Sequence, residues 1–246
     1  LAILLILAFP IGPANAAAQA PAIAAAADLK FALAEIASQF RAATGGEVRI
    51  AYGSSGNFAH QIENGAPFEL FLSADEAYVE RLAAKGLTRD AGALYAIGRI
   101  VLFVPSGSTL EPDPQLAGLR AALRDGRIKR FAIANPEHAP YGRAAREALQ
   151  QADLWQAIRP VLVLGENASQ ATQFAASGSA QGGIVPLSLA RAPEIARLGT
   201  SALIPANAHQ PLRQRMVLLR DAGPAAAAFF AWLQTPSARK VFVRYG

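Results

Sequence analysis

The sequence predicts an α/β protein of two lobes, each a mostly parallel sheet flanked by helices, with a ligand cleft between the lobes. Helix and strand patterns alternate along the chain from residue 28 onward, and such alternation is typical of a parallel sheet covered by helices. A Pro- and Gly-rich stretch at 105–118 interrupts the alternation, which then restarts. The restart indicates a second lobe.

The first run of elements is the clearest. Apolar residues at 4-3-4 spacing, from Leu29 to Phe40, predict an amphipathic helix. The segment 73–76 has the form of a capping box, with Ser73 as the N-cap and Glu76 as the N3 residue. The expected elements are a helix at 28–43, a strand at 48–52, a helix after the turn at 53–57, a strand at 68–72 and a helix that ends at Gly86.

The second run predicts the other lobe and a return to the first. The expected elements are a strand at 97–104, a helix near 116–123, a strand at 131–134, a helix at 141–151, a strand at 161–164, a helix at 168–177, strands at 183–187 and 216–220, and two C-terminal helices. Crossovers near 101–105 and 212–217 would then assign residues 17–102 and 216–246 to the first lobe. Residues 103–215 would form the second.

The first 16 residues have the character of a signal peptide. An apolar run too short to span a bilayer precedes the small-x-small sequence Ala14-Asn15-Ala16, so we expect export to the periplasm with cleavage after Ala16. The basic n-region is missing, and the alternative is an N-terminal membrane anchor. About 225 residues follow, enough for one large or two smaller α/β lobes with a core.

Composition excludes several classes of function. The chain has no cysteine, which excludes disulfides, thiolate metal sites and a thiol nucleophile. Its net charge of +5 comes from scattered Arg residues without interleaved aromatics, so we expect no nucleic-acid partner. The three His residues lack the spacing of metal ligands, and no Walker or Gly-x-Gly-x-x-Gly motif supports a nucleotide cofactor.

Four short polar or Gly-rich segments lie where a predicted strand passes into a helix: 26–29, 53–57, 136–142 and 166–170. Helix starts carry free backbone N–H groups and the positive end of the helix dipole. Ligands of such sheets bind beyond the carboxyl ends of the strands, so several helix starts together predict an oxyanion site without Lys or Arg. Hydroxyls of Ser54 and Ser55 and the N–H of Tyr141 are the candidate donors. Ordinary N-caps and a packed Tyr are the alternative explanation.

A second function class starts from the same serine. Gly53-Ser54-Ser55-Gly56-Asn57 is one residue away from the Gly-x-Ser-x-Gly elbow of serine hydrolases. A hydrolase would need a His and an acid beside Ser55. No candidate stands out, because His60 lies only five residues on, so this remains a remote alternative to a binding protein.

Five motifs occur in order along residues 22–246: Ala-Ala-Ala-Asp-Leu at 25–29, Gly-Ser-Ser-Gly at 53–56 with Gln-Ile-Glu-Asn-Gly-Ala-Pro at 61–67, Leu-Phe-Leu-Ser-Ala-Asp at 70–75, Asn-Pro-Glu-His-Ala-Pro-Tyr-Gly at 135–142 and Gly-Ile-Val-Pro at 183–186. In this order they resemble the periplasmic molybdate/tungstate-binding proteins of ABC importers. The resemblance implies a type II periplasmic binding protein fold, a monomer, a non-catalytic role and delivery of the anion to a membrane permease.

The resemblance also implies which residues hold the anion. Ser55 would use its side chain and N–H, Tyr141 and Ala168 their N–H groups, and the first position falls on Ala27 and Asp28. Relatives offer Ser or a Thr-Asn pair at that first position, whereas an ionised Asp28 only accepts hydrogen bonds. No cofactor is expected besides the bound molybdate or tungstate.

Three outcomes are open for Asp28. Its side chain turns away to cap its own helix, which we favour; a low-dielectric site protonates it; or it marks a different ligand. A carboxylate would accept a hydrogen bond from a protonated oxyanion, so phosphate is retained as an alternative ligand. Sulfate and chromate are the other alternative ligands. A second departure, Pro186 where some members have Tyr, carries less weight because other members also lack that Tyr.

Overall fold

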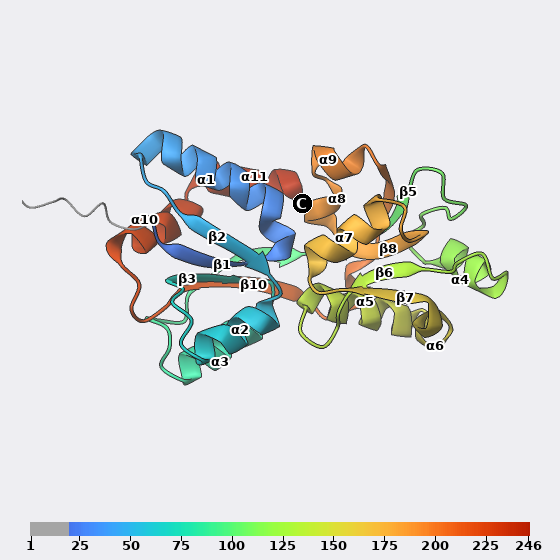
Figure 1. Cartoon of the computed structure of the whole chain (residues 1–246), viewed down its shortest axis with the longest axis horizontal. Helices are drawn as coiled ribbons and strands as arrows, with labels where there is room; N and C mark the ends of the chain where they lie inside the picture. Colours follow the sequence, from blue (N-terminus) through green and yellow to red (C-terminus); the bar gives the residue numbers. More distant parts are fainter. Residues whose placement is uncertain (1–19) are drawn as a thin grey trace, which may run out of the picture.

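The structure, a computed structural model, describes residues 20–246. The predicted signal peptide lies outside the described residues. Within the described part, helices are either too short or too polar to cross a membrane. The chain forms two lobes side by side along the long axis of the molecule, each built on a five-stranded sheet (Figure 1).

The first sheet has the order β2-β1-β3-β10-β4. Its strands are β1 (Ala22–Ala26), β2 (Arg49–Gly53), β3 (Leu70–Ser73), β4 (Ala93–Gly98) and β10 (Leu212–Leu218). Strands β2, β1 and β3 run parallel, whereas β10 is antiparallel to both of its neighbours. The helices of this lobe are the 3-10 turn η1 (Ala27–Leu29), α1 (Lys30–Thr44), α2 (Ser55–Glu63), α3 (Glu76–Ala84), α10 (Pro224–Leu233) and α11 (Pro236–Tyr245).

Side-chain alternation along these strands divides the first core between two faces. Leu70 and Leu72 pack with α1, α10 and α11, whereas Phe71 between them packs with α2 and α3. Figure 1 shows the same layering, with α1 and α11 above the sheet and α2 and α3 below it. The alternation follows from the two-residue period of a strand.

The second sheet has the order β7-β6-β8-β5-β9. Its strands are β5 (Ile100–Pro105), β6 (Phe131–Ala134), β7 (Leu162–Gly165), β8 (Gly182–Pro186) and β9 (Gly199–Leu203). Again three strands are parallel, and β5 is antiparallel to both β8 and β9. The helices of this lobe are α4 (Ala117–Arg124), α5 (Pro140–Gln151), α6 (Trp155–Ile158), η2 (Arg159–Val161), α7 (Ala168–Ala176), α8 (Leu187–Ala190) and α9 (Pro193–Ala196), and η3 (Ala206–Ala208) follows β9.

The expected two-lobed α/β architecture is confirmed, with differences in detail. The strand expected at 97–104 is two strands, β4 and β5, and the chain changes sheets at Arg99. It returns between β9 and β10, so residues 100–102 and 212–215 lie in the opposite lobe to the one expected. The sequence does not predict strand β9, because Gly-Thr-Ser-Ala-Leu lacks a buried apolar alternation.

The predicted capping box at 73–76 is wrong. Ser73 is still the last residue of β3, and Asp75 is the N-cap of α3, where its side chain accepts from the Ala77 N–H at 3.0 Å. The Ser73 hydroxyl instead donates to the Asp75 carbonyl at 2.7 Å. Glu76 does not turn back to the cap, because its carboxylate pairs with Arg213 and Arg215 of β10.

Candidate functional site

The four predicted polar segments meet where the two lobes face each other. Parallel strands place their carboxyl ends at one edge of each sheet, and here η1 follows β1, α2 follows β2, α5 follows β6 and α7 follows β7. Helix α7 packs against η1 of the other lobe, and these junctions lie near the middle of the molecule (Figure 1). Four helix starts from two lobes therefore converge.

All six predicted site residues are buried in this region, with exposed fractions of 6% or less. They are Ala27, Asp28, Ser54, Ser55, Tyr141 and Ala168. None of them is cationic, so the positive potential offered to a ligand here comes from backbone N–H groups and helix dipoles. The part of each residue in binding remains a prediction.

Ser55 is the first residue of α2 and is fully buried. Its Oγ accepts the Ala74 N–H at 2.9 Å, which occupies one lone pair and leaves the hydroxyl proton free. A hydroxyl held in this way can donate to an anion. Among the described residues no His is hydrogen-bonded to Ser55, so the arrangement gives no support to a Ser55 nucleophile.

Ser54, by contrast, joins the lobes. It is the N-cap of α2, accepting the Asn57 N–H at 3.4 Å, and its hydroxyl lies 2.9 Å from Nδ1 of His138 in the loop before α5. The next residue, Gly56, donates its N–H to the His138 carbonyl at 3.0 Å. A Cβ atom on Gly56 would lie 2.6 Å from that carbonyl oxygen. The lobes thus approach so closely that only glycine fits.

Glu166 extends the same contact to the fourth segment. Its Oε1 accepts from the Asn57 side-chain amide at 2.6 Å and lies 3.7 Å from Nε2 of His138. Segment 53–57 of the first lobe is therefore hydrogen-bonded to both segments 136–142 and 166–170 of the second lobe.

Asp28 connects the first segment to the third. Its Oδ2 accepts the Tyr141 hydroxyl at 3.1 Å and the Gln214 amide at 3.0 Å, and the Gln214 amide also lies 2.8 Å from the Tyr141 hydroxyl. The three residues come from η1, α5 and β10. The Asp28 carbonyl accepts the Ser188 hydroxyl of α8 at 2.9 Å.

The favoured expectation for Asp28 is corrected by these contacts. Its side chain is not the N-cap of η1 or α1, and its Oδ2 is bound instead by the Tyr141 hydroxyl and the Gln214 amide. Burial raises the pKa of Asp28 to about 6, against opposing hydrogen bonds from Gln214 and Tyr141. Burial also raises the pKa of Tyr141 well above its ordinary value, so that hydroxyl stays neutral and donates.

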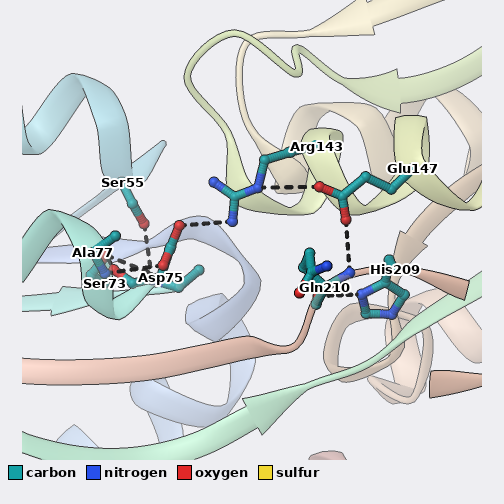
Figure 2. A network of polar contacts seen from close by, with 9 residues as sticks. Ser55, Ser73, Asp75, Ala77, Arg143, Glu147, His209 and Gln210 are labelled. Carbon is teal, nitrogen blue, oxygen red and sulfur yellow. Dashed lines mark hydrogen bonds and ion pairs between the residues drawn. The ribbon is translucent and has the colours of Figure 1, made fainter. Parts of the chain in front are cut away.

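An ion pair links the two lobes at a second place, shown in Figure 2. Nη2 of Arg143 in α5 lies 2.7 Å from Oδ2 of Asp75, the N-cap of α3 in the other lobe. Arg143 also lies 3.7 Å from Glu147, which accepts the Gln210 N–H at 2.8 Å from the segment that returns to the first lobe. The network links both lobes to the second crossover.

Replacing Arg143 with alanine is expected to reduce oxyanion affinity by less than about fivefold, because partly exposed ion pairs contribute about 0.2–1 kcal/mol. Arg143 is 32% exposed, so added salt should weaken the wild type toward the variant. Isothermal titration calorimetry at low and high salt measures both effects. A loss larger than tenfold, insensitive to salt, would show that Arg143 acts on the ligand directly.

The raised pKa of Asp28 leads to a prediction about the stability of the protein. Its folded pKa lies above its ordinary value, so the stability that its neutral form contributes is full below pH about 4 and is lost as the pH rises through about 6. Asp28→Asn keeps the shape and an acceptor for Tyr141 and Gln214. We expect the unliganded variant to gain about 3 kcal/mol over the wild type between pH 4 and 7.

Denaturant unfolding of both proteins across this pH range checks the difference, in which other titrating groups cancel. Unfolding free energies that differ by a constant amount at every pH would contradict the raised pKa.

Sequence reasoning missed several residues of this region. Gln214 and Arg143 act through partners far away in the chain, and no local pattern marks either. Gly56 and His138 lie inside two of the four predicted polar segments, but their mutual contact depends on how the two lobes meet. A clue to Gly56 was available in the Gly-Ser-Ser-Gly turn itself.

The sequence and the fold are both similar to those of known proteins. The chain matches the family described as "Bacterial extracellular solute-binding protein" over residues 22–246. The chain belongs to this family. It is 36% identical over 247 residues to the molybdate-binding protein ModA of Azotobacter vinelandii, covering 98% of this chain and 96% of that one. It is 36% identical over 244 residues to ModA of Rhodobacter capsulatus, covering 98% and 93%.

A solved structure of the same class gives the same architecture. The periplasmic molybdate-binding protein of Azotobacter vinelandii aligns with a TM-score of 0.81 and 30% identity, over 92% of this chain and 97% of that chain. The sulfate-binding protein SubI of Mycobacterium tuberculosis aligns with a TM-score of 0.74 at 18% identity, which shows a common fold alone. The predicted family and the two-lobed solute-binding fold are therefore confirmed.

Proposed function

We propose that this protein is a periplasmic receptor that captures molybdate, and also tungstate, between its lobes and delivers it to a membrane ABC permease. It acts as a monomer and catalyses no reaction. The observation that carries the proposal is the convergence of four helix starts and the Ser55 hydroxyl in a buried region between two lobes. The identity to two molybdate-binding proteins over nearly the full chain supports the choice of ligand.

The chemistry of the site suits a fully ionised tetrahedral oxyanion. Such an ion offers only acceptor oxygens, and the candidate donors are N–H groups of Ala27, Asp28, Ser55, Tyr141 and Ala168 with the Ser55 hydroxyl. The ligand contacts are oxygens and the site needs no cofactor. Among the described residues no cluster of three His, Cys, Asp or Glu side chains is positioned to hold a metal ion.

Size and protonation would set the selectivity. Molybdate and tungstate have longer bonds to oxygen than sulfate, so a site closed to a fixed size by contacts such as Gly56 to His138 leaves sulfate without some of its partners. Phosphate carries a proton near neutral pH and needs an acceptor. Chromate lies between these ions in size.

A thermal-shift titration of the protein with molybdate, tungstate, chromate, sulfate and phosphate tests the proposal. Ligand at about 100 times its dissociation constant adds roughly 2.7 kcal/mol, a shift of a few degrees for a chain of this size. We expect shifts with molybdate and tungstate and none with sulfate. A larger shift with phosphate, or no shift with any metal oxyanion, would contradict the proposal.

A further inference from the structure

The two carboxyl oxygens of Asp28 are in different situations. Oδ2 accepts two hydrogen bonds, from the Tyr141 hydroxyl and the Gln214 amide. Oδ1 is buried and has no hydrogen-bond partner. An ionised carboxylate with one oxygen left bare in a buried site is costly, whereas a neutral acid is less so. If the group carries a proton, Oδ1 is the oxygen that holds it, because Oδ2 is already an acceptor twice.

The place of Asp28 makes its charge matter for a ligand. It lies in η1, between the predicted site residue Ala27 and helix α1, and α7, which begins at Ala168, packs against the same turn. An oxyanion held there by backbone N–H groups is a dianion close to this carboxyl. Like charges at close range favour the protonated form of the acid.

We propose that binding of the oxyanion is coupled to the uptake of one proton by Oδ1 of Asp28. The inference rests on the proposed function and deepens it. The proton comes from solvent and leaves with the ligand, and no covalent bond other than O–H changes. A protonated Oδ1 can donate to an acceptor oxygen, whereas an ionised Oδ1 can only repel it.

The surroundings of Asp28 are consistent with a group that changes charge. Burial raises its pKa to about 6 in the protein without ligand, so it is mostly ionised at neutral pH and one proton is available to be taken up. Burial also raises the pKa of its phenolic neighbours, Tyr95 and Tyr141, well above the ordinary value. Those two side chains therefore stay neutral in the range where Asp28 titrates.

The remaining titratable groups near Asp28 line a small cavity beside it, of about 30 Å³. They are Arg99 of the β4–β5 junction and Tyr245 of α11. Among the described residues neither Arg99 nor any other cation forms an ion pair with Asp28. No ion pair therefore holds Asp28 in its ionised form when a dianion arrives.

Proton-linked binding gives the site a preference for fully ionised over protonated oxyanions, beyond the preference that the number of hydrogen-bond donors sets. The affinity for a fully ionised oxyanion rises as the pH falls toward 6. The affinity for a protonated oxyanion such as monohydrogen phosphate rises less. Its hydroxyl must donate a hydrogen bond, and an Oδ1 that carries a proton is a poor acceptor for it. Asp28 would then act against phosphate, although an ionised Asp28 would favour it.

Calorimetry with molybdate at pH about 7.5, in buffers that differ in ionisation enthalpy, measures the protons taken up. We expect close to one proton per molybdate for the wild type, and an affinity that falls about tenfold per pH unit between pH about 7 and 8. Asp28→Asn should bind molybdate with no proton uptake and no such slope. The wild-type measurement stands alone if the variant does not fold.

His138 is another titratable group at the lobe interface, so His138→Gln is the control, and it should still take up the proton. Loss of uptake in His138→Gln, or a wild type that binds without uptake and with a flat pH profile, would overturn the coupling while leaving the molybdate receptor intact. Failure of wild type and Asp28→Asn alike to bind molybdate at every pH would overturn both proposals.

Discussion

Replacing Gly56 with alanine is expected to weaken molybdate binding by about 10- to 100-fold. The added Cβ would meet the His138 carbonyl at 2.6 Å and the Tyr78 hydroxyl at 3.0 Å. The carbonyl belongs to the other lobe, so the lobes must stay further apart. Forcing an extra methyl into such a contact costs about 1–3 kcal/mol, and the cost falls on the arrangement in which the lobes meet.

Calorimetry gives the affinity and thermal unfolding without ligand gives the stability. Gly223→Ala is the matched control, because its Cβ would meet only the flexible end of Glu69, at 3.2 Å, in a loop before α10. It should bind as the wild type does. If Gly56→Ala binds molybdate normally, closure to the observed distance is not needed for binding.

Replacing Ser55 with alanine should cause the other large loss, again about 10- to 100-fold in affinity. The variant removes a hydroxyl whose proton is free to donate to the anion, and hydrogen bonds to charged groups contribute about 1.5–3 kcal/mol. It also leaves the buried Ala74 N–H without its acceptor, which lowers the unfolding free energy by about 1–3 kcal/mol.

Ser73→Ala separates these two effects. Ser73 is equally buried, but its hydroxyl donates to the Asp75 carbonyl, so it has no proton to offer a ligand. We expect reduced stability and an affinity much closer to that of the wild type. Equal losses of affinity in both variants would show that Ser55 acts through the fold and not on the anion.

Much of this arrangement was predictable from the sequence because strand ends and helix starts have local signals. The turn at 53–57 and the loop at 136–142 were located by their composition, and the rule for parallel sheets placed them at one edge. The contacts between the segments were not predictable. Gln214 reaches Asp28 from a strand whose register against β4 shifts between Gln214 and Arg215. No spacing in the sequence encodes that shift.

The cap of α3 shows the same limit at short range. Ser73 and Asp75 are both good N-cap residues, and the sequence favoured the first because Glu76 follows it by three. Ser73 pairs with Arg215 of β10 and is still part of the strand, so the helix begins only after Asp75. A strand formed by residues far apart in the chain therefore decided where a helix begins.

The position of β10 has a consequence for the order in which the protein folds. This strand lies between β3 and β4, with Met216 opposite Leu72, so the first sheet is incomplete until the chain has been made to beyond residue 218. The second sheet is formed by residues 100–203 without interruption. Contacts between distant parts of a chain form slowly, so the second lobe should reach its native structure first. The N-terminal lobe, although it is synthesised earlier, is then the last to become resistant to proteolysis.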